Sequence, residues 1–95
     1  MNQTSAIPRA DRIAALLRAH FAPAIIEVVD DSASHAGHAG AAPGGETHYN
    51  VRIVASAFAG MNRVARSRAV HAALTHELAT GLHALSLKLL APDEA

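Results

Sequence analysis

The chain has 95 residues and a formal net charge of zero, because eight lysine and arginine residues balance eight aspartate and glutamate residues; it also contains seven histidines. This length suits one domain with a single modest core. The balanced charge argues against a protein whose main function is to bind the phosphate backbone of nucleic acids, since such domains are usually strongly basic. The lack of cysteine excludes disulfides, cysteine zinc sites and thiol chemistry for this chain alone.

The first half of the chain predicts a helix, a strand and a long loop. Apolar residues recur at helical spacing in the first segment: Ile13, Leu16, Leu17 and Phe21. This pattern predicts a helix over residues 8–20, which Pro23 stops. The β-branched run that follows predicts a strand over residues 25–30. Residues 31–46 then form a loop rich in histidine and glycine, and loops of this length inside compact domains are usually functional or disordered.

The second half predicts a strand, a helix and a further strand. Residues 47–55 alternate between apolar and polar side chains, as in a half-exposed strand. A helical pattern follows over residues 62–80, where Asn62 is suited to cap the start and Gly81 to follow the end. Leucines at alternate positions predict the last strand over residues 83–90.

These elements predict a single domain over residues 1–95, with a frayed N-terminal tail at 1–7 and a polar C-terminal tail at 91–95. The first two strands are joined without a helix and should pair antiparallel. The last two are joined through a helix and should run parallel, with both helices on one face of the sheet. No apolar run reaches transmembrane length and we recognise no signal peptide, so we expect a soluble cytoplasmic protein.

The predicted topology brings distant histidines together. If the last two strands are parallel neighbours, His83 starts its strand beside the end of the loop that carries His35 and His38. Up to three imidazoles would then converge on one metal ion and leave an open position for water or a partner's ligand. The parity of His83 matches the apolar face of its strand and places it at the rim of the core. The alternatives are solvated loop histidines and a hydrogen-bonded His83.

Five segments resemble the BolA family in the family's order: "HFAPAIIEVVDDS", "HAGH", "GGETHYNVRIV", "FAGMNRVARSRAVHAAL" and "ELATGLHALSLKLLAPDE". The resemblance covers nearly the whole chain. It implies an α+β fold, a single α-β-β-α-β domain similar to a class II KH domain, with helices on one face of a three-stranded mixed sheet. It also implies a non-enzymatic adaptor that pairs with CGFS monothiol glutaredoxins in iron–sulfur trafficking or iron homeostasis.

The resemblance further implies a [2Fe-2S] cluster bridged between the two partners. The glutaredoxin would give its active-site cysteine and the thiol of a bound glutathione. This chain would give His83 and a loop histidine, His38 or in its place His35. His48 would be structural or would contact the ligands without binding the cluster itself. The chain alone would hold no cluster tightly, and it would be a monomer or a weak homodimer.

The alternative function is a DNA-binding transcriptional regulator. The KH-like fold and a basic strip on the second helix would carry it, with four arginines as contacts to nucleic acid or to a partner: Arg52, Arg63, Arg66 and Arg68. Ser67 stands where the family usually has a histidine, which bears on the contacts of this segment. An enzyme is not expected, because the sequence offers no nucleophile, base and acid set.

Overall fold

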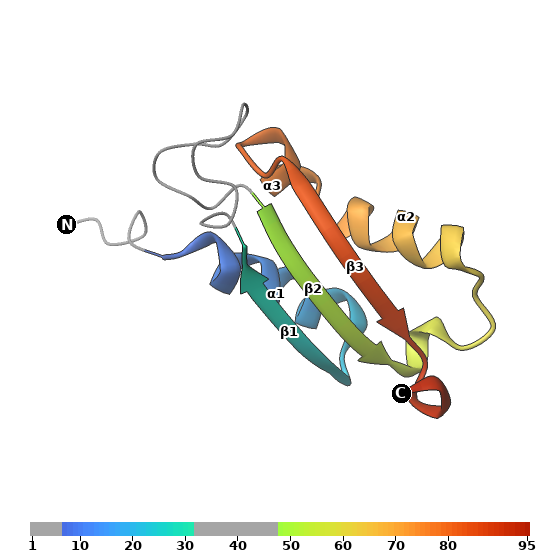
Figure 1. Cartoon of the computed structure of the whole chain (residues 1–95). Coiled ribbons are helices and arrows are strands. Elements are labelled where there is room, and N and C mark those ends of the chain that lie inside the picture. Colours follow the sequence, from blue (N-terminus) through green and yellow to red (C-terminus); the bar gives the residue numbers. More distant parts are fainter. Residues whose placement is uncertain (1–6, 32–47) are drawn as a thin grey trace.

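The computed structural model describes residues 7–31 and 48–95, and its elements follow the predicted order (Figure 1). The elements are α1 (Arg9–Phe21), β1 (Ala24–Asp30), β2 (His48–Ala55), η3 (Ser56–Phe58), α2 (Arg63–Ala73), α3 (Thr75–Ala79), β3 (Ala84–Leu90) and η4 (Pro92–Glu94), where η marks a 3₁₀ helix. The predicted first helix and all three strands agree with these bounds to within one residue at each end.

Helix α1 is set by its apolar spacing and by the prolines beside it. Ile13, Leu17 and Phe21 recur every fourth residue and are buried, so one stripe of the helix faces the sheet. Pro8 takes an extended conformation just before the first turn. Pro23, joined to Ala22 by a cis peptide bond, lies two residues past the end and has no N–H with which to continue the helix.

The three strands form one mixed sheet in the order β1-β2-β3. Strands β1 and β2 are antiparallel, with Ala24 opposite Ala55 and Asp30 opposite Tyr49. Strands β2 and β3 are parallel, with His48 opposite Ala84. The predicted α+β topology is therefore confirmed.

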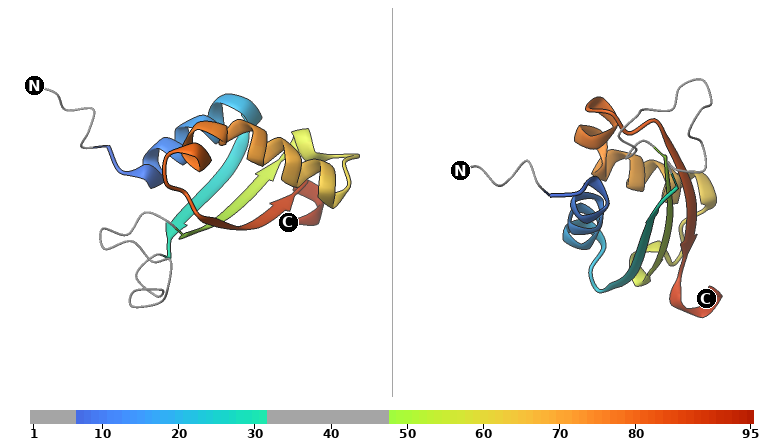
Figure 2. Two further views of the ribbon diagram at one scale, coloured as in Figure 1. Left: turned by 90° about the horizontal axis from the view of Figure 1, so that it is seen from above. Right: turned by 60° about the vertical axis from the view of Figure 1, so that its left-hand side comes forward.

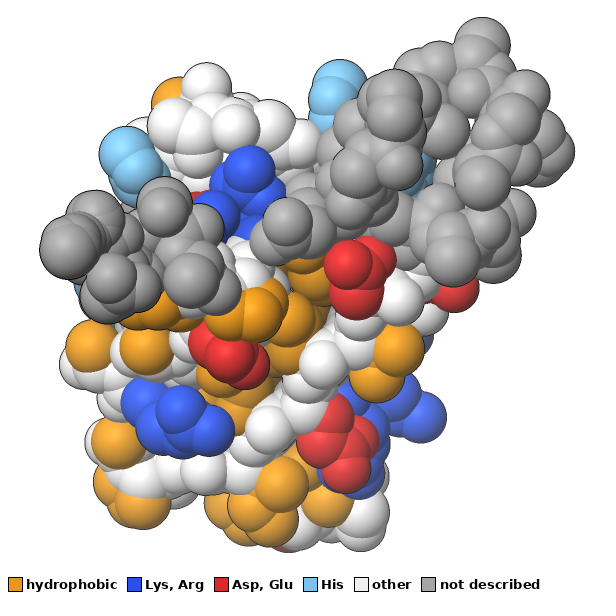
Figure 3. All heavy atoms as spheres, turned by 90° about the vertical axis from the view of Figure 1, so that its left-hand side faces the viewer, with side chains coloured by type: hydrophobic (Ala, Val, Ile, Leu, Met, Phe, Trp, Pro, Cys, Tyr) orange, Lys and Arg blue, Asp and Glu red, His pale blue; other side chains and the backbone are white. Residues whose placement is uncertain are grey.

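The two faces of the sheet differ in burial, as the alternating sequence predicts. Tyr49, Val51 and Ile53 point from β2 into the core, and the helices cover only this face (Figure 2). On the other face, Ile25 and Val29 of β1 remain 61% and 57% exposed. Hydrophobic, acidic and basic side chains are interspersed on the side of the domain seen in Figure 3, in keeping with the balanced charge of the chain.

The prediction of a single helix over residues 62–80 is wrong, because the structure has two helices there, α2 and α3, separated at Leu74. The predicted cap at its start is confirmed, since the Asn62 side chain accepts a hydrogen bond from the Ala65 N–H at 2.8 Å. At the break, the Thr75 hydroxyl donates to the carbonyl of Ala72 at 2.9 Å, an alternative to continued helical bonding. The short α3 then takes its own direction and carries Glu77 toward α1.

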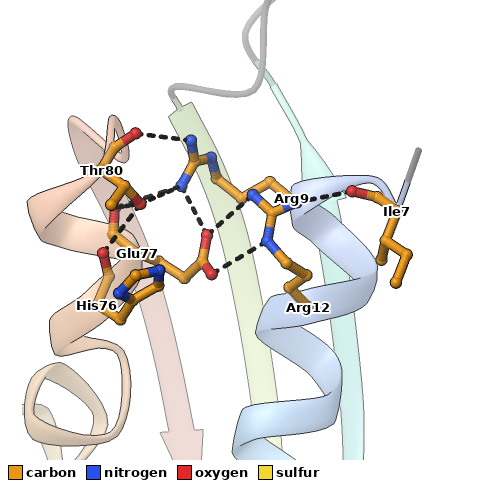
Figure 4. A network of polar contacts seen from close by, with 6 residues as sticks. All are labelled: Ile7, Arg9, Arg12, His76, Glu77 and Thr80. Carbon is orange, nitrogen blue, oxygen red and sulfur yellow. Dashed lines mark hydrogen bonds and ion pairs between the residues drawn. The ribbon is translucent and has the colours of Figure 1, made fainter. Parts of the chain in front are cut away.

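Glu77 is buried between α1 and α3 and is held by two arginines (Figure 4). The Arg9 Nη1 atom lies 2.6 Å from Oε1, and the Arg12 Nε atom lies 3.1 Å from Oε2. Arg9 also donates to the carbonyl of Thr80 at 3.0 Å. Burial alone would raise the pKa of Glu77, but hydrogen bonds and charge from Arg12 and Arg9 outweigh it and hold the pKa below its usual value.

Gly81 links this ion network to the third strand. Its backbone φ of +131° is one that residues with a side chain rarely adopt. A Cβ at this position would lie 2.9 Å from the Arg9 Nη2 atom. The next residue, Leu82, is buried and donates its N–H to the Glu77 carbonyl at 3.0 Å. The glycine predicted after the helix is thus required by the backbone geometry, whereas a Cβ there would meet only the movable end of the Arg9 side chain.

The predicted C-terminal tail has a defined structure for much of its length. Residues Pro92–Glu94 form η4, and the Glu94 carboxylate accepts a hydrogen bond from the Ala91 N–H at 2.7 Å. Ala91 itself is buried. Across residues 7–31 and 48–95, none of the helices combines the length and the apolar character needed to cross a membrane.

We predict that Glu77→Gln destabilises the domain by about 3 kcal/mol, because it removes one partner of a buried ion pair and leaves the Arg9 guanidinium without its charge partner. Urea unfolding at neutral pH, followed by far-ultraviolet circular dichroism, measures this loss. Because the pKa of Glu77 is lowered on folding, its contribution is complete above pH 4.5 and is lost as pH falls through the folded-state pKa.

Glu27→Gln is the matched control, since Glu27 is 61% exposed and its carboxylate lies 3.9 Å from Arg52. An exposed pair at this distance contributes little. Equal losses in the two variants would contradict the structural role assigned to Glu77.

Candidate metal centre

His83 stands on a short main-chain segment that is anchored on both sides. Leu82 before it is buried and hydrogen-bonded to Glu77, and Ala84 after it is the first residue of β3. The His83 side chain itself is exposed. Its predicted packing at the rim of the core is therefore wrong: it precedes the strand, so the alternation of the strand does not fix its direction.

The imidazole of His48 lies beside that of His83. His48 is the first residue of β2 and is opposite Ala84 in the parallel register. The two ring centroids are 6.3 Å apart and the ring planes differ by 11°, so the rings stack. The predicted placement of His83 at the start of β2 is confirmed, and the structure adds His48 as its ring neighbour.

His35 and His38, the predicted loop ligands, lie outside the described residues. The two described residues on either side of their segment are Asp31 and His48, and the Asp31 N–H donates to the His48 carbonyl at 2.8 Å. The two ends of the described chain that flank this segment therefore lie side by side, and His48 brings them next to His83. This proximity is what a ligand set shared between that segment and His83 requires.

Taken by themselves, the described residues could supply only part of a ligand set for a metal ion. Within residues 7–31 and 48–95, no group of three or more histidine, aspartate or glutamate side chains is arranged to hold a metal ion. A pocket of about 150 Å³ is lined by His48 but not by His83, and its other lining residues include Asp31 and Ser86. Two neighbouring imidazoles are suitable donors for iron or zinc, but a tetrahedral site needs four ligands. A metal ion bound here would need further ligands from outside the described part of the chain.

The basic strip predicted from four arginines is wrong, because Arg66 is buried and committed to internal contacts. Its Nη1 and Nη2 atoms lie 2.6 Å and 3.2 Å from the two carboxylate oxygens of Glu94. It also donates to the carbonyls of Met61 and Leu89 at 2.9 Å and 3.0 Å. The guanidinium lies 5.8 Å from the centroid of the Phe58 ring. Arg66 therefore fastens the C-terminal turn to α2 and β3.

The other three arginines do not share one surface. Arg52 lies on the face of the sheet that the helices leave open, where its nearest acidic partner is Glu27. Arg63 and Arg68 are exposed on α2. The sequence does not distinguish Arg66 from the others, because arginines on a helix are typical of a solvated face.

The Arg66 contact also explains the acidity of Glu94. The hydrogen bond from Arg66, together with the one from the Ala91 N–H, lowers the pKa of Glu94 to about 2. A carboxylate held in this way stays ionised over nearly the whole pH range in which a small domain is folded.

Comparison with known proteins gives consistent matches. The sequence model of a family described as "BolA-like protein" matches residues 17–94. An uncharacterized protein of a Sinorhizobium species is 52% identical over 75 residues, which cover 78% of this chain and 81% of that protein. Protein BOLA1, chloroplastic, of Arabidopsis thaliana is 45% identical over 89 residues, which cover 92% of this chain and 56% of that protein.

Two further matches extend the comparison. The DNA-binding transcriptional regulator BolA of Escherichia coli is 40% identical over 77 residues, which cover 81% of this chain and 70% of that protein. Among solved structures, the BolA domain of SufE1 from Arabidopsis thaliana has a TM-score of 0.82 at 44% identity and covers 92% of this chain and 95% of that domain. The chain thus spans most of the bacterial relatives but about half of the plant BOLA1.

We predict that Glu94→Gln lowers the thermal midpoint by a few degrees at neutral pH, because it removes the charge that Arg66 binds. Because the pKa of Glu94 falls to about 2 on folding, its stabilising contribution is complete above pH 4.5 and is lost as pH falls from 4.5 toward 2. Thermal melts followed by circular dichroism between pH 2 and 7 measure both effects.

Asp93→Asn is the control, because Asp93 lies in the same turn and no hydrogen bond joins it to Arg66 among the described contacts. A midpoint for Glu94→Gln equal to that of Asp93→Asn at every pH would show that the carboxylate does not hold the turn.

Proposed function

The chain belongs to the BolA-like protein family, and on that premise we propose that it is a non-enzymatic adaptor that pairs with a CGFS monothiol glutaredoxin. The two proteins share a [2Fe-2S] cluster in this proposal. The pair acts in iron–sulfur cluster trafficking or iron homeostasis, and we expect it in the cytoplasm.

The observation that carries the proposal is the exposed His83, which lies beside one other imidazole and could be only one of several ligands to a cluster. His83 is exposed at the end of the sheet, and its ring neighbour is His48. A [2Fe-2S] cluster needs four ligands, which are thiolates or, in part, imidazoles. Because this chain has no cysteine, the thiolates come from the glutaredoxin cysteine and its bound glutathione.

The residues of this chain have distinct roles in the proposal. His83 binds one iron through a ring nitrogen, and His38, or His35 in its place, is the second ligand. His48 stacks against His83 and limits the directions that its ring can take. When bound, the cluster supplies a one-electron redox centre whose reduction potential is raised by imidazole ligands.

We predict that adding this chain to a glutaredoxin loaded with a [2Fe-2S] cluster changes the visible circular dichroism spectrum, because imidazoles replace ligands of the cluster. The His83→Ala variant should leave the glutaredoxin spectrum unaltered. A titration of the loaded glutaredoxin with each protein measures the difference.

His71→Ala is the matched control, since His71 is another exposed histidine, on α2, and its ring donates to the Ser67 carbonyl at 2.8 Å. The variants His35→Ala and His38→Ala, tested singly and together, identify the loop ligand. A normal spectral change with His83→Ala would refute the ligand assignment.

The second candidate function is DNA binding, and the observation that favours it is the 40% identity to the Escherichia coli regulator. Arg63 and Arg68 are the exposed cations of α2 that remain for such contacts once Arg66 is engaged by Glu94. Contacts to phosphates make binding weaken steeply with added salt.

If this role holds, double-stranded DNA is retarded by the protein at physiological salt, and Arg63→Ala with Arg68→Ala reduces the affinity severalfold. Arg18→Ala is the control, because Arg18 is an exposed cation of α1. The absence of retardation by both the free protein and the glutaredoxin complex would count against DNA binding.

A further inference from the structure

A groove runs between α2 and β3, with a volume of about 460 Å³. Its polar walls come from Arg63, Arg66, Ser67 and Lys88, and its apolar surface comes from leucines of β3. The groove residues of β3 lie at its carboxyl end, whereas His83 precedes its amino end. In Figure 1, α2 lies alongside the outer edge of β3. The groove is therefore separate from His48 and His83.

The chain's own acidic segment shows which chemistry this region binds. Glu94 of η4 is held by two hydrogen bonds from Arg66, one to each carboxylate oxygen. Contacts with the Met61 carbonyl and the Phe58 ring hold the guanidinium in place. Such a bidentate pair is the strong form of carboxylate recognition. One end of the groove thus already binds a carboxylate from an acidic turn.

Two further cations of the groove have no such partner. Arg63 and Lys88 are exposed, and over residues 7–31 and 48–95 neither forms an ion pair with an acidic side chain. The groove is lined by three cations, while the charges of two carboxylates, Glu94 and Asp93, act on Arg66, so one positive charge is left in excess. This excess favours a ligand with further carboxylates.

The strand edge and the leucines favour an extended peptide as that ligand. β3 is an edge strand of the sheet, and its Leu89 carbonyl accepts a hydrogen bond from Arg66, so main-chain groups of β3 face the groove. Edge strands bind extended peptides through such groups. Leu87 and Leu89 are half-buried and offer apolar contact to alternate side chains. Single-stranded nucleic acid is disfavoured, because the lining of the groove includes no aromatic side chain on which bases stack.

We propose that the groove between α2 and β3 binds an extended acidic peptide segment of a partner protein. Carboxylates of that segment pair with Arg63 and Lys88, and its apolar side chains rest on Leu87 and Leu89. The proposal goes beyond the cluster function and uses none of the histidines, so either can fail without the other.

A fluorescein-labelled peptide of alternating valine and glutamate tests the proposal in fluorescence polarisation at low salt. The same peptide with glutamine in place of glutamate is the ligand control and should bind at least about tenfold more weakly. In the ¹⁵N-labelled protein, the valine–glutamate peptide should shift the amide signals of residues 63–67 and 87–90. No binding, or shifts confined to other residues, would overturn the proposal.

Charge-reversal variants separate this groove from general attraction to a basic protein. The double variant Arg63→Glu, Lys88→Glu should lose at least about tenfold in affinity for the peptide. The double variant Arg18→Glu, Arg68→Glu changes the net charge equally at exposed sites outside the groove and should bind almost normally. Equal losses in both would refute a specific site, and the single variants serve if a double variant is unfolded. Groove shifts caused by single-stranded DNA but not by the peptide would make it a nucleic-acid site instead.

Discussion

The buried carboxylate of Glu77 is the contact on which the arrangement of this small domain depends. It joins α1 to α3 through Arg9 and Arg12, and the same stretch of chain carries Gly81 and Leu82 into β3. A buried carboxylate is tolerated only where its charge is compensated. The requirement to compensate Glu77 therefore fixes α3 against α1, and this in turn fixes the start of the third strand.

The parallel pairing of β2 and β3 then determines which side chains meet. His48 and His83 are far apart in sequence. The strand register nevertheless places His48 opposite Ala84, the residue after His83. The described residues bring two imidazoles together without a third protein ligand for a metal. A site with this composition suits a function shared with another protein, which is the basis of the adaptor proposal.

Much of the fold could be predicted from the sequence because apolar periodicity is strong in α1 and in the strands. The break at Leu74 could not, since Leu74 fits the helical stripe and a threonine after it does not by itself end a helix; here the Thr75 hydroxyl donates to the Ala72 carbonyl, and α3 brings Glu77 to Arg9 and Arg12. The burial of Arg66 was missed for a similar reason: its partner Glu94 lies in a segment whose composition is typical of a loose tail. The loop ligand stays a prediction, because His35 and His38 lie outside the described residues.

The anchoring of Leu82 and Ala84 has an entropic consequence for any partner that binds His83. The main chain on both sides is already ordered by the core and the sheet, so association need not immobilise it. The remaining loss is the rotamer freedom of one imidazole side chain, about 0.5–1.5 kcal/mol for a side chain immobilised at an interface. Stacking on His48 reduces that freedom beforehand. The domain thus presents His83 in a partly preorganised state, which lets even a small interface bind through it.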